Sequence, residues 1–172
     1  VFWLASTPAF FAIALLVLGV SDPPRGDEAG KAPPSLKGAL KLDTATWSMI
    51  VLTAVIGLAR FSEAFLVMKG LDVGVPETYA PAAIILLHIV FGLAAFPVGA
   101  LSDRIGRGSL LLLSLAFLAA ADVVLAVSTG QIAYYSGVAL WGLHMGFSQG
   151  LLMTLIADAA PLHLRGSAFG LF

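Results

Sequence analysis

The chain has 172 residues, of which 59% are hydrophobic and 11% are charged, and its formal net charge is −1. A soluble domain has roughly 25% charged residues, so this composition, with a mean hydropathy of +0.99, excludes water as the main solvent. The small net charge, without a basic block, argues against nucleic acid as a partner. Because the sequence has no cysteine, we expect neither a disulfide framework nor a thiolate metal site.

Five apolar stretches are long enough to cross a bilayer as helices, which takes about 20 residues at about 1.5 Å per residue. We predict transmembrane helices at residues 1–20, 47–68, 79–101, 110–127 and 132–156, with a sixth beginning near Ser167. The strands of a membrane barrel would alternate apolar and polar residues, whereas these stretches are apolar throughout. The predicted fold class is an all-α, polytopic bundle of transmembrane helices, with about five and a half spans present.

A long polar segment, residues 21–46, separates the first two predicted spans. It contains most of the charges of this region and four prolines, Pro23, Pro24, Pro33 and Pro34. Such a segment is predicted to be a solvated linker. Since the chain starts with Val1 and its last apolar stretch has only begun at Phe172, we expect it to be a fragment of a longer protein.

The basic residues between the predicted spans alternate from gap to gap. The first, third and fifth gaps contain Arg25, Lys31, Lys37, Lys41, Arg104, Arg107 and Arg165, whereas the second contains Lys69 alone and the fourth contains none. Because cytoplasmic loops are enriched in Lys and Arg, we predict that the odd-numbered gaps face the cytoplasm. The expected location is the cell membrane, as a multi-pass inner-membrane or plasma-membrane protein.

Several polar residues lie inside the predicted spans, where a charged side chain costs about 2.5–3.5 kcal/mol. Arg60 and Glu63 are three residues apart on one helical face, so they either neutralise each other or face substrate. His88 and His144 are predicted near mid-depth, where histidine relays protons or packs as a neutral side chain. With Gln149, these residues are the candidates for a substrate or ion pathway.

Two further features of the spans support weaker interpretations. Asp122 lies near the outer end of its span and is expected to reach outer water. Gly142, Gly146 and Gly150 recur at every fourth position of the fifth span, and such a stripe favours close helix packing in membranes.

An alternative function arises from residues 146–150, which match Gly-x-Ser-x-Gly, the nucleophile motif of hydrolases. The alternative is an intramembrane serine hydrolase that uses Ser148 with His88 or His144 as the base. The motif requires a strand-to-helix turn, however, and here it lies inside an apolar predicted helix. A channel or a purely structural membrane protein is the third possibility.

The third gap carries glycines and charges in a defined order. Its sequence is Gly99-Ala100-Leu101-Ser102-Asp103-Arg104-Ile105-Gly106-Arg107. It resembles the signature loop of the major facilitator superfamily, Gly-x-x-x-Asp-Arg-x-Gly-Arg, which follows the second and, more loosely, the eighth helix of those transporters. Glycine permits a tight reversal of the chain, and arginine binds carboxylates or lipid phosphates. Gly108 departs from the family pattern, which has a basic residue there.

A second element supports the same resemblance. Asp158 is followed by Arg165 and Gly166, which is similar to the acidic-x6-Arg element leading into the family's fifth or eleventh helix. With the long linker, the two elements align the chain with about the sixth helix to the start of the eleventh. By this resemblance, residues 1–20 are the last helix of an N-terminal bundle, residues 21–46 a central cytoplasmic linker, and residues 47–172 an incomplete C-terminal bundle.

The resemblance implies a secondary transporter that moves a small solute by alternating access, driven by a proton or sodium gradient. It implies no catalytic residue, no cofactor and no metal, and its partners would be a small-molecule substrate, a coupling ion and membrane lipids. Arg107 would pair with Asp158 when the cytoplasmic side is closed, and Asp103 would cap the helix that begins near Ser167. Alternatively, the basic turns only anchor to lipid headgroups. The full gate and signature-loop set is Gly99, Asp103, Arg104, Gly106, Arg107, Asp158, Arg165 and Gly166.

Overall fold

The computed structural model describes residues 10, 13–14, 17–19 and 42–171, and the chain divides into two compact units, residues 1–33 and 34–172. In the first unit, the described residues are helical and exposed. The rest of the first predicted span and residues 21–41 of the predicted linker lie outside the described residues.

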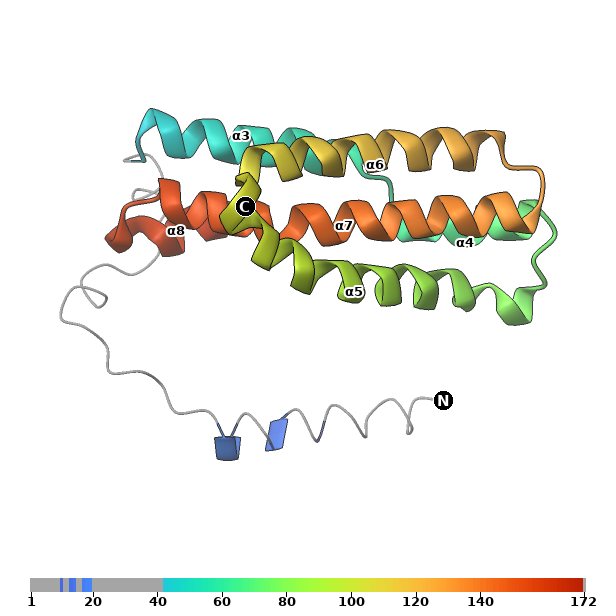
Figure 1. Ribbon diagram of the computed structural model, residues 1–172. Coiled ribbons are helices and arrows are strands. Elements are labelled where there is room, and N and C mark those ends of the chain that lie inside the picture. The colour runs from blue at the N-terminus through green and yellow to red at the C-terminus, as the bar shows by residue number, and fades with distance from the viewer. Residues whose placement is uncertain (1–9, 11–12, 15–16, 20–41, 172) are drawn as a thin grey trace. The chain divides into compact units, whose positions relative to one another are not determined.

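The described part of the second unit consists of helices and turns and contains no strand (Figure 1). Its helices are α3 (Thr44–Ala59), α4 (Glu63–Asp72), α5 (Pro81–Ile105), α6 (Arg107–Val127), α7 (Gln131–Ala159) and α8 (Arg165–Leu171), with short 3-10 turns at Glu77–Tyr79 and Leu162–Leu164. Four stretches are long and apolar enough to cross a membrane: Thr44–Asp72, Glu77–Ser102, Arg107–Val127 and Gln131–Ala159. They correspond to the second to fifth predicted spans, and the all-α membrane bundle is confirmed.

The first of these stretches begins three residues earlier than predicted because Asp43 caps α3. The Asp43 carboxylate accepts hydrogen bonds from the hydroxyl and the backbone N–H of Thr46, and together these hold the pKa of Asp43 below its ordinary value. Thr46 is buried, and its hydroxyl also lies 2.9 Å from the carbonyl oxygen of Ala159. The start of α3 is therefore attached to the end of α7.

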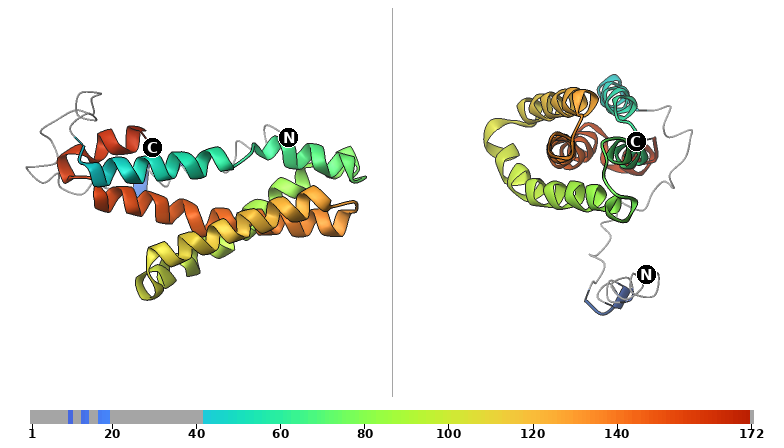
Figure 2. Two further views of the ribbon diagram at one scale, coloured as in Figure 1. Left: turned by 90° about the horizontal axis from the view of Figure 1, so that it is seen from above. Right: turned by 90° about the vertical axis from the view of Figure 1, so that its right-hand side faces the viewer.

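Helix α7 is the centre of the bundle. It contacts α3, α4, α5, α6 and α8, and the end-on view of Figure 2 shows it between the other long helices. In the main core, Val138 and Trp141 of α7 pack with Leu87 of α5 and Leu118 of α6. Because α7 is buried on several sides, its apolar residues are not confined to one face.

Two glycines of the predicted stripe allow α7 to lie close to α5. A Cβ atom on Gly142 would be 2.7 Å from the carbonyl oxygen of Leu87, and one on Gly146 would be 2.7 Å from the Cβ of Ala94. Gly150 is different, because a Cβ there would have no atom within 4 Å. Among the described residues, Gly150 therefore makes no close contact with another helix and instead lines an open cavity between α3, α5 and α7.

The helices alternate in direction, so the described basic residues separate between the two ends of the bundle. The start of α3, the α5–α6 corner and the α7–α8 corner form one end, which we call the basic end because it contains Arg104, Arg107 and Arg165. Lys69 lies at the opposite end. The end-to-end separation of these charges agrees with the alternating pattern in the sequence.

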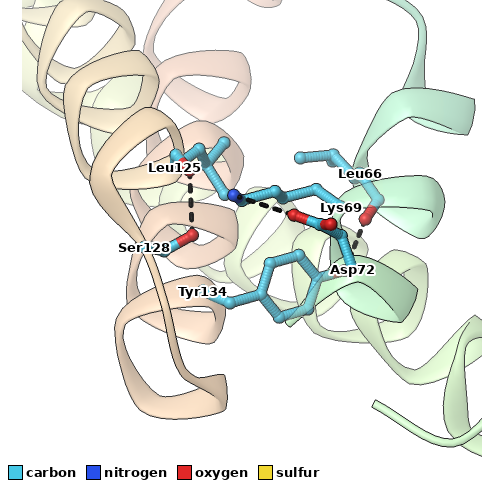
Figure 3. A network of polar contacts seen from close by, with 6 residues as sticks. All are labelled: Leu66, Lys69, Asp72, Leu125, Ser128 and Tyr134. Carbon is cyan, nitrogen blue, oxygen red and sulfur yellow. Dashed lines mark hydrogen bonds and ion pairs between the residues drawn. The ribbon is translucent and has the colours of Figure 1, made fainter. Parts of the chain in front are cut away.

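At the opposite end, short polar contacts attach α4 to α7 (Figure 3). The Tyr134 hydroxyl donates to the carbonyl oxygen of Leu66 at 2.7 Å, and a Cβ on Gly70 would be 2.8 Å from that hydroxyl oxygen. Lys69 forms an ion pair with Asp72 at 3.4 Å. The side-chain nitrogen of Gln131 also donates to the carbonyl oxygen of Gly74. The Tyr134 bond thus joins α7 to α4, the Gln131 bond joins α7 to the turn after α4, and the ion pair lies within α4.

The glycine packing predicts that replacing glycine by alanine affects the stability of the protein differently at two positions of α7. Gly142→Ala should lower the free energy of unfolding by about 1–3 kcal/mol, because its new methyl group meets a backbone carbonyl that cannot rotate away. Gly150→Ala is the matched control and should leave stability unchanged or raise it by about 0.5–1 kcal/mol, since alanine favours helix. Thermal unfolding in detergent micelles measures both, and equal losses would contradict the packing described here.

Candidate functional site

The second predicted span is broken near its middle. Residues 60–62 are not helical, and the backbone is extended at Arg60 and at Ser62, which caps α4. In membranes, such breaks occur where irregular backbone is buried in protein or lines a water-filled cavity. Transporters often place substrate and ion sites at these discontinuities, close to the bilayer midplane.

The side chain of Arg60 crosses from this break to α7. Its Nε donates to Nε2 of His144 at 3.0 Å, and its Nη2 donates to the hydroxyl oxygen of Ser148. His144 in turn lies 2.8 Å, through Nδ1, from the carbonyl oxygen of Ser114 on α6. His144, Ser148 and Ser114 are fully buried. We call these four residues the Arg60 cluster.

The hydrogen bonds determine which nitrogen of His144 carries a proton. Because arginine is always charged and only donates, Nε2 of His144 must be the acceptor and holds no proton. The carbonyl of Ser114 accepts only, so Nδ1 must carry the proton and donate to it. His144 is therefore neutral, and its one basic lone pair is occupied by the guanidinium.

An aromatic pair next to the cluster holds the break against α7. The ring of Phe61 stacks on Trp141 with the ring centroids 5.3 Å apart and the planes at 29°. Stacked aromatic rings of this kind contribute about 0.5–1.5 kcal/mol beyond their buried area. Arg60 and Phe61 thus attach the break to α7 by two different contacts.

A cavity of about 690 Å³ extends from Arg60 between α3, α5 and α7 towards the basic end. Arg60 is the only charged residue among the described residues that line it. The polar lining residues are Thr53, Ser102, Gln149 and Thr154, and the remainder are apolar residues or glycines. We call this space the Arg60 cavity. A pocket of this size, mostly apolar with a few polar groups, suits a small organic molecule.

A second cavity of similar volume lies between α4 and α6 at the opposite end, beside the Lys69–Asp72 pair. Asp122 lines it, and one of its carboxylate oxygens, Oδ1, is buried without a hydrogen-bond partner. Asp122 was predicted to reach outer water. This oxygen is not in contact with outer water, although the residue as a whole is partly exposed.

Two of the predicted pathway residues do not join the Arg60 cluster. Glu63 is the first residue of α4, and among the described residues it forms no ion pair with Arg60, because the break turns the two side chains apart. His88 is exposed, and its Nδ1 lies 2.8 Å from the carbonyl oxygen of Ile84 in its own helix. Of the two alternatives for Arg60 and Glu63, the neutralising pair is not formed among the described residues, and Gln149 is the predicted residue that lines the cavity with Arg60.

Ser148 and His144 are close together but do not form a nucleophile–base pair. The Ser148 hydroxyl donates to the backbone carbonyl of His144 at 2.8 Å, and both imidazole nitrogens already have other partners. A serine hydrolase needs the imidazole to accept the serine proton. Ser148 also lies within the continuous helix α7 rather than on a strand-to-helix turn.

The signature loop forms a very short corner. Gly106 alone separates α5 from α6, and its φ of 90° lies in a region that only glycine enters freely. Arg107, at the first position of α6, forms an ion pair with Asp158 near the end of α7. Arg104 and Gly166 are exposed, and Nε of Arg165 is buried without a partner. The side chain of Asp103 lies outside the described part of the structure, so its predicted capping role stays a prediction.

Sequence reasoning missed the helix break and the role of Ser114. Ser62 followed by Glu63 was an available signal, because serine is a preferred N-cap and an acidic residue favours the first helical turn. No sequence signal pointed to Ser114, since it contributes its backbone carbonyl rather than its side chain.

Comparison with known proteins gives one match. The sequence model described as Major Facilitator Superfamily matches residues 1–172. No curated protein and no solved structure matches the chain significantly.

The two hydrogen bonds of His144 predict which substitutions it tolerates. Glutamine can donate to Ser114 and accept from Arg60 through its amide, so His144→Gln should keep nearly the full stability of the protein. His144→Leu removes the second hydrogen bond to the Ser114 carbonyl and leaves one guanidinium donor without its partner, and should cost about 1–3 kcal/mol. Thermal unfolding in detergent micelles gives both values. If the leucine variant were as stable as the glutamine variant, the hydrogen bonds would not hold the cluster together.

Proposed function

The chain belongs to the major facilitator superfamily of membrane transporters, and we propose that it forms part of a secondary transporter that moves a small solute by alternating access. The observation that carries this proposal is the Arg60 cluster, which lies at a helix break beside a cavity of about 690 Å³. A discontinuous helix with polar groups at mid-span is the arrangement that solute and ion sites of secondary transporters use.

The proposed domain organisation follows the family. Residues 1–20 would be the last helix of an N-terminal bundle, residues 21–46 the cytoplasmic linker, and residues 47–172 an incomplete C-terminal bundle. Two findings support this division: the family match extends over both parts, and the boundary between the compact units, after Pro33, falls within the proposed linker.

The proposed driving force is an ion gradient. His144 supports a proton as the coupling ion, because histidine is the side chain that exchanges a proton near neutral pH, and its basic nitrogen is hydrogen-bonded to Arg60, which lines the cavity. Uptake by the full-length protein in proteoliposomes tests the proposal. We expect solute accumulation that stops when the gradient is collapsed, and a strong loss of accumulation in Arg60→Gln. Solute flux that continues unchanged after the gradient is collapsed would favour a channel instead.

The proposed orientation, in the cell membrane, places the basic end in the cytoplasm. Single cysteines test it without background from this chain, which has none. Ser109 near the basic end and Thr129 at the opposite end are both exposed. We expect an impermeant maleimide to label Thr129→Cys in intact cells and Ser109→Cys only after permeabilisation. The reverse labelling would invert the orientation.

The Arg107–Asp158 pair would act as a latch that favours closure of the cytoplasmic side. The two side chains are 32% and 57% exposed, so the pair contributes only about 0–1 kcal/mol, less than a desolvated pair would. Such a contribution shifts a two-state equilibrium by up to about fivefold.

A charge swap separates a latch from a lipid anchor. Arg107→Ala should slow uptake by up to about fivefold with expression retained. Exchanging the residues, Arg107→Asp with Asp158→Arg, should recover part of the rate if they form a functional pair. An anchor to lipid phosphate would instead lose affinity when residue 107 becomes acidic, and the exchanged protein would be at least as slow as Arg107→Ala.

A further inference from the structure

The charge of Arg60 has no carboxylate partner among the described residues, although the side chain is half-buried in a membrane-spanning segment. Its two hydrogen bonds go to neutral acceptors on His144 and Ser148. Guanidinium carries five donors, so donors remain for a ligand in the adjoining cavity. An isolated charge in a membrane interior is costly, and a carboxylate is the group that binds guanidinium with two parallel hydrogen bonds.

The present contacts of Arg60 prevent His144 from taking up a proton. Nε2 of His144 accepts from Arg60, so the lone pair that would bind a proton is occupied. If the guanidinium turns towards an anion in the cavity, this lone pair is released, and the anion also favours a positive imidazolium nearby. Nδ1 can keep its hydrogen bond to Ser114 throughout, so the ring need not rotate.

We propose that the Arg60 cavity binds an organic carboxylate on Arg60 and a proton on His144 together. A proton from the solution forms the new N–H bond at Nε2, and no group is oxidised or reduced. The incoming negative and positive charges cancel, so the loaded site carries the same net charge as the empty one. This inference rests on the proposed function, since it names the substrate class and the coupling ion of the same site.

The surroundings of His144 contain no competing proton acceptor among the described residues. On α6, the nearest carboxylate is Asp122, about two helical turns beyond Ser114 and in the other cavity. On α5, the titratable group at similar depth is His88, which is exposed and bonded to its own backbone. From the α3–α4 segment, Arg60 faces the imidazole, whereas Glu63 pairs with neither. Among these groups, His144 is therefore the one that would bind the proton.

The lining of the cavity favours an anion with an apolar body. Beyond Arg60 the walls are mainly aliphatic or aromatic, as at Ile50, Phe91 and Val98. Gln149 of α7 and Thr53 of α3 supply polar groups to the lining. A highly hydrated ion such as phosphate would lose water here without replacement hydrogen bonds, whereas a monocarboxylate with a hydrocarbon body would bury that body against the apolar wall.

Calorimetry on the full-length protein in detergent tests the proposal with acetate, butyrate and benzoate, each beside its neutral amide. We expect the carboxylates to bind more tightly than their amides, and affinity to rise with apolar size. Repeating the titration in buffers of different ionisation enthalpy should give about one proton taken up per benzoate near pH 7. Because binding takes up a proton, the apparent Kd should rise with pH, by up to about tenfold per pH unit.

Three variants test the carboxylate site at Arg60 and the proton site at His144 separately. Arg60→Gln should abolish the preference for carboxylate over amide. His144→Gln keeps both neighbours of His144 satisfied but cannot titrate, so benzoate binding should persist with no proton uptake and no pH dependence. His88→Gln is the matched control outside the site and should behave as the unmodified protein.

The outcomes that overturn the proposal differ from those that overturn transport. Equal binding of carboxylates and amides rules out the anion site. Proton uptake that persists in His144→Gln, or carboxylate binding without any proton uptake, rules out His144 as the proton site. If proteoliposomes show no gradient-driven accumulation but calorimetry shows coupled binding, the proposed function fails and this inference stands.

Discussion

The hydrogen bond from Arg60 to His144 is the contact on which the site depends. In a membrane, unpaired interior polar groups are costly, and this bond gives one donor of Arg60 and the buried imidazole of His144 a partner at once. It also determines the tautomer of His144 and leaves the remaining guanidinium donors for the cavity. The neighbouring break between α3 and α4 places Arg60 at this position.

The rest of the bundle holds that contact in place. Gly142 and Gly146 let α7 approach α5 closely, while Phe61 stacks on Trp141 and Tyr134 binds the backbone of α4. Closer to the basic end, α5 separates from α7 and opens the Arg60 cavity. The proposed solute site needs both the close packing near the cluster and the open space beside it, because it must be preorganised and accessible at once.

The sequence predicted the second to fifth spans well, because long apolar runs and glycine-rich corners leave few alternatives in a bilayer. It did not predict the break, since the apolar residues of α3 and α4 continue into one another and Arg60 and Glu63 fit a single helical face. The sequence also could not show that His144 is buried in the site whereas His88 is exposed. The two have similar depths, and only the packing of α5 and α7 shows that one is exposed and the other buried. Likewise, Gly150 continues the spacing of the glycine stripe but lies where α5 has already diverged.

Nitrogen-15 NMR of the histidine side chains tests the central claim most directly, because the two imidazole nitrogens report separately whether they carry a proton. The sequence contains three histidines, and the signal that disappears in His144→Gln identifies His144. The account predicts a neutral ring near pH 7 without ligand, with the proton on Nδ1 and none on Nε2. A charged imidazolium, or a neutral ring with the proton on Nε2, would contradict the Arg60–His144 hydrogen bond.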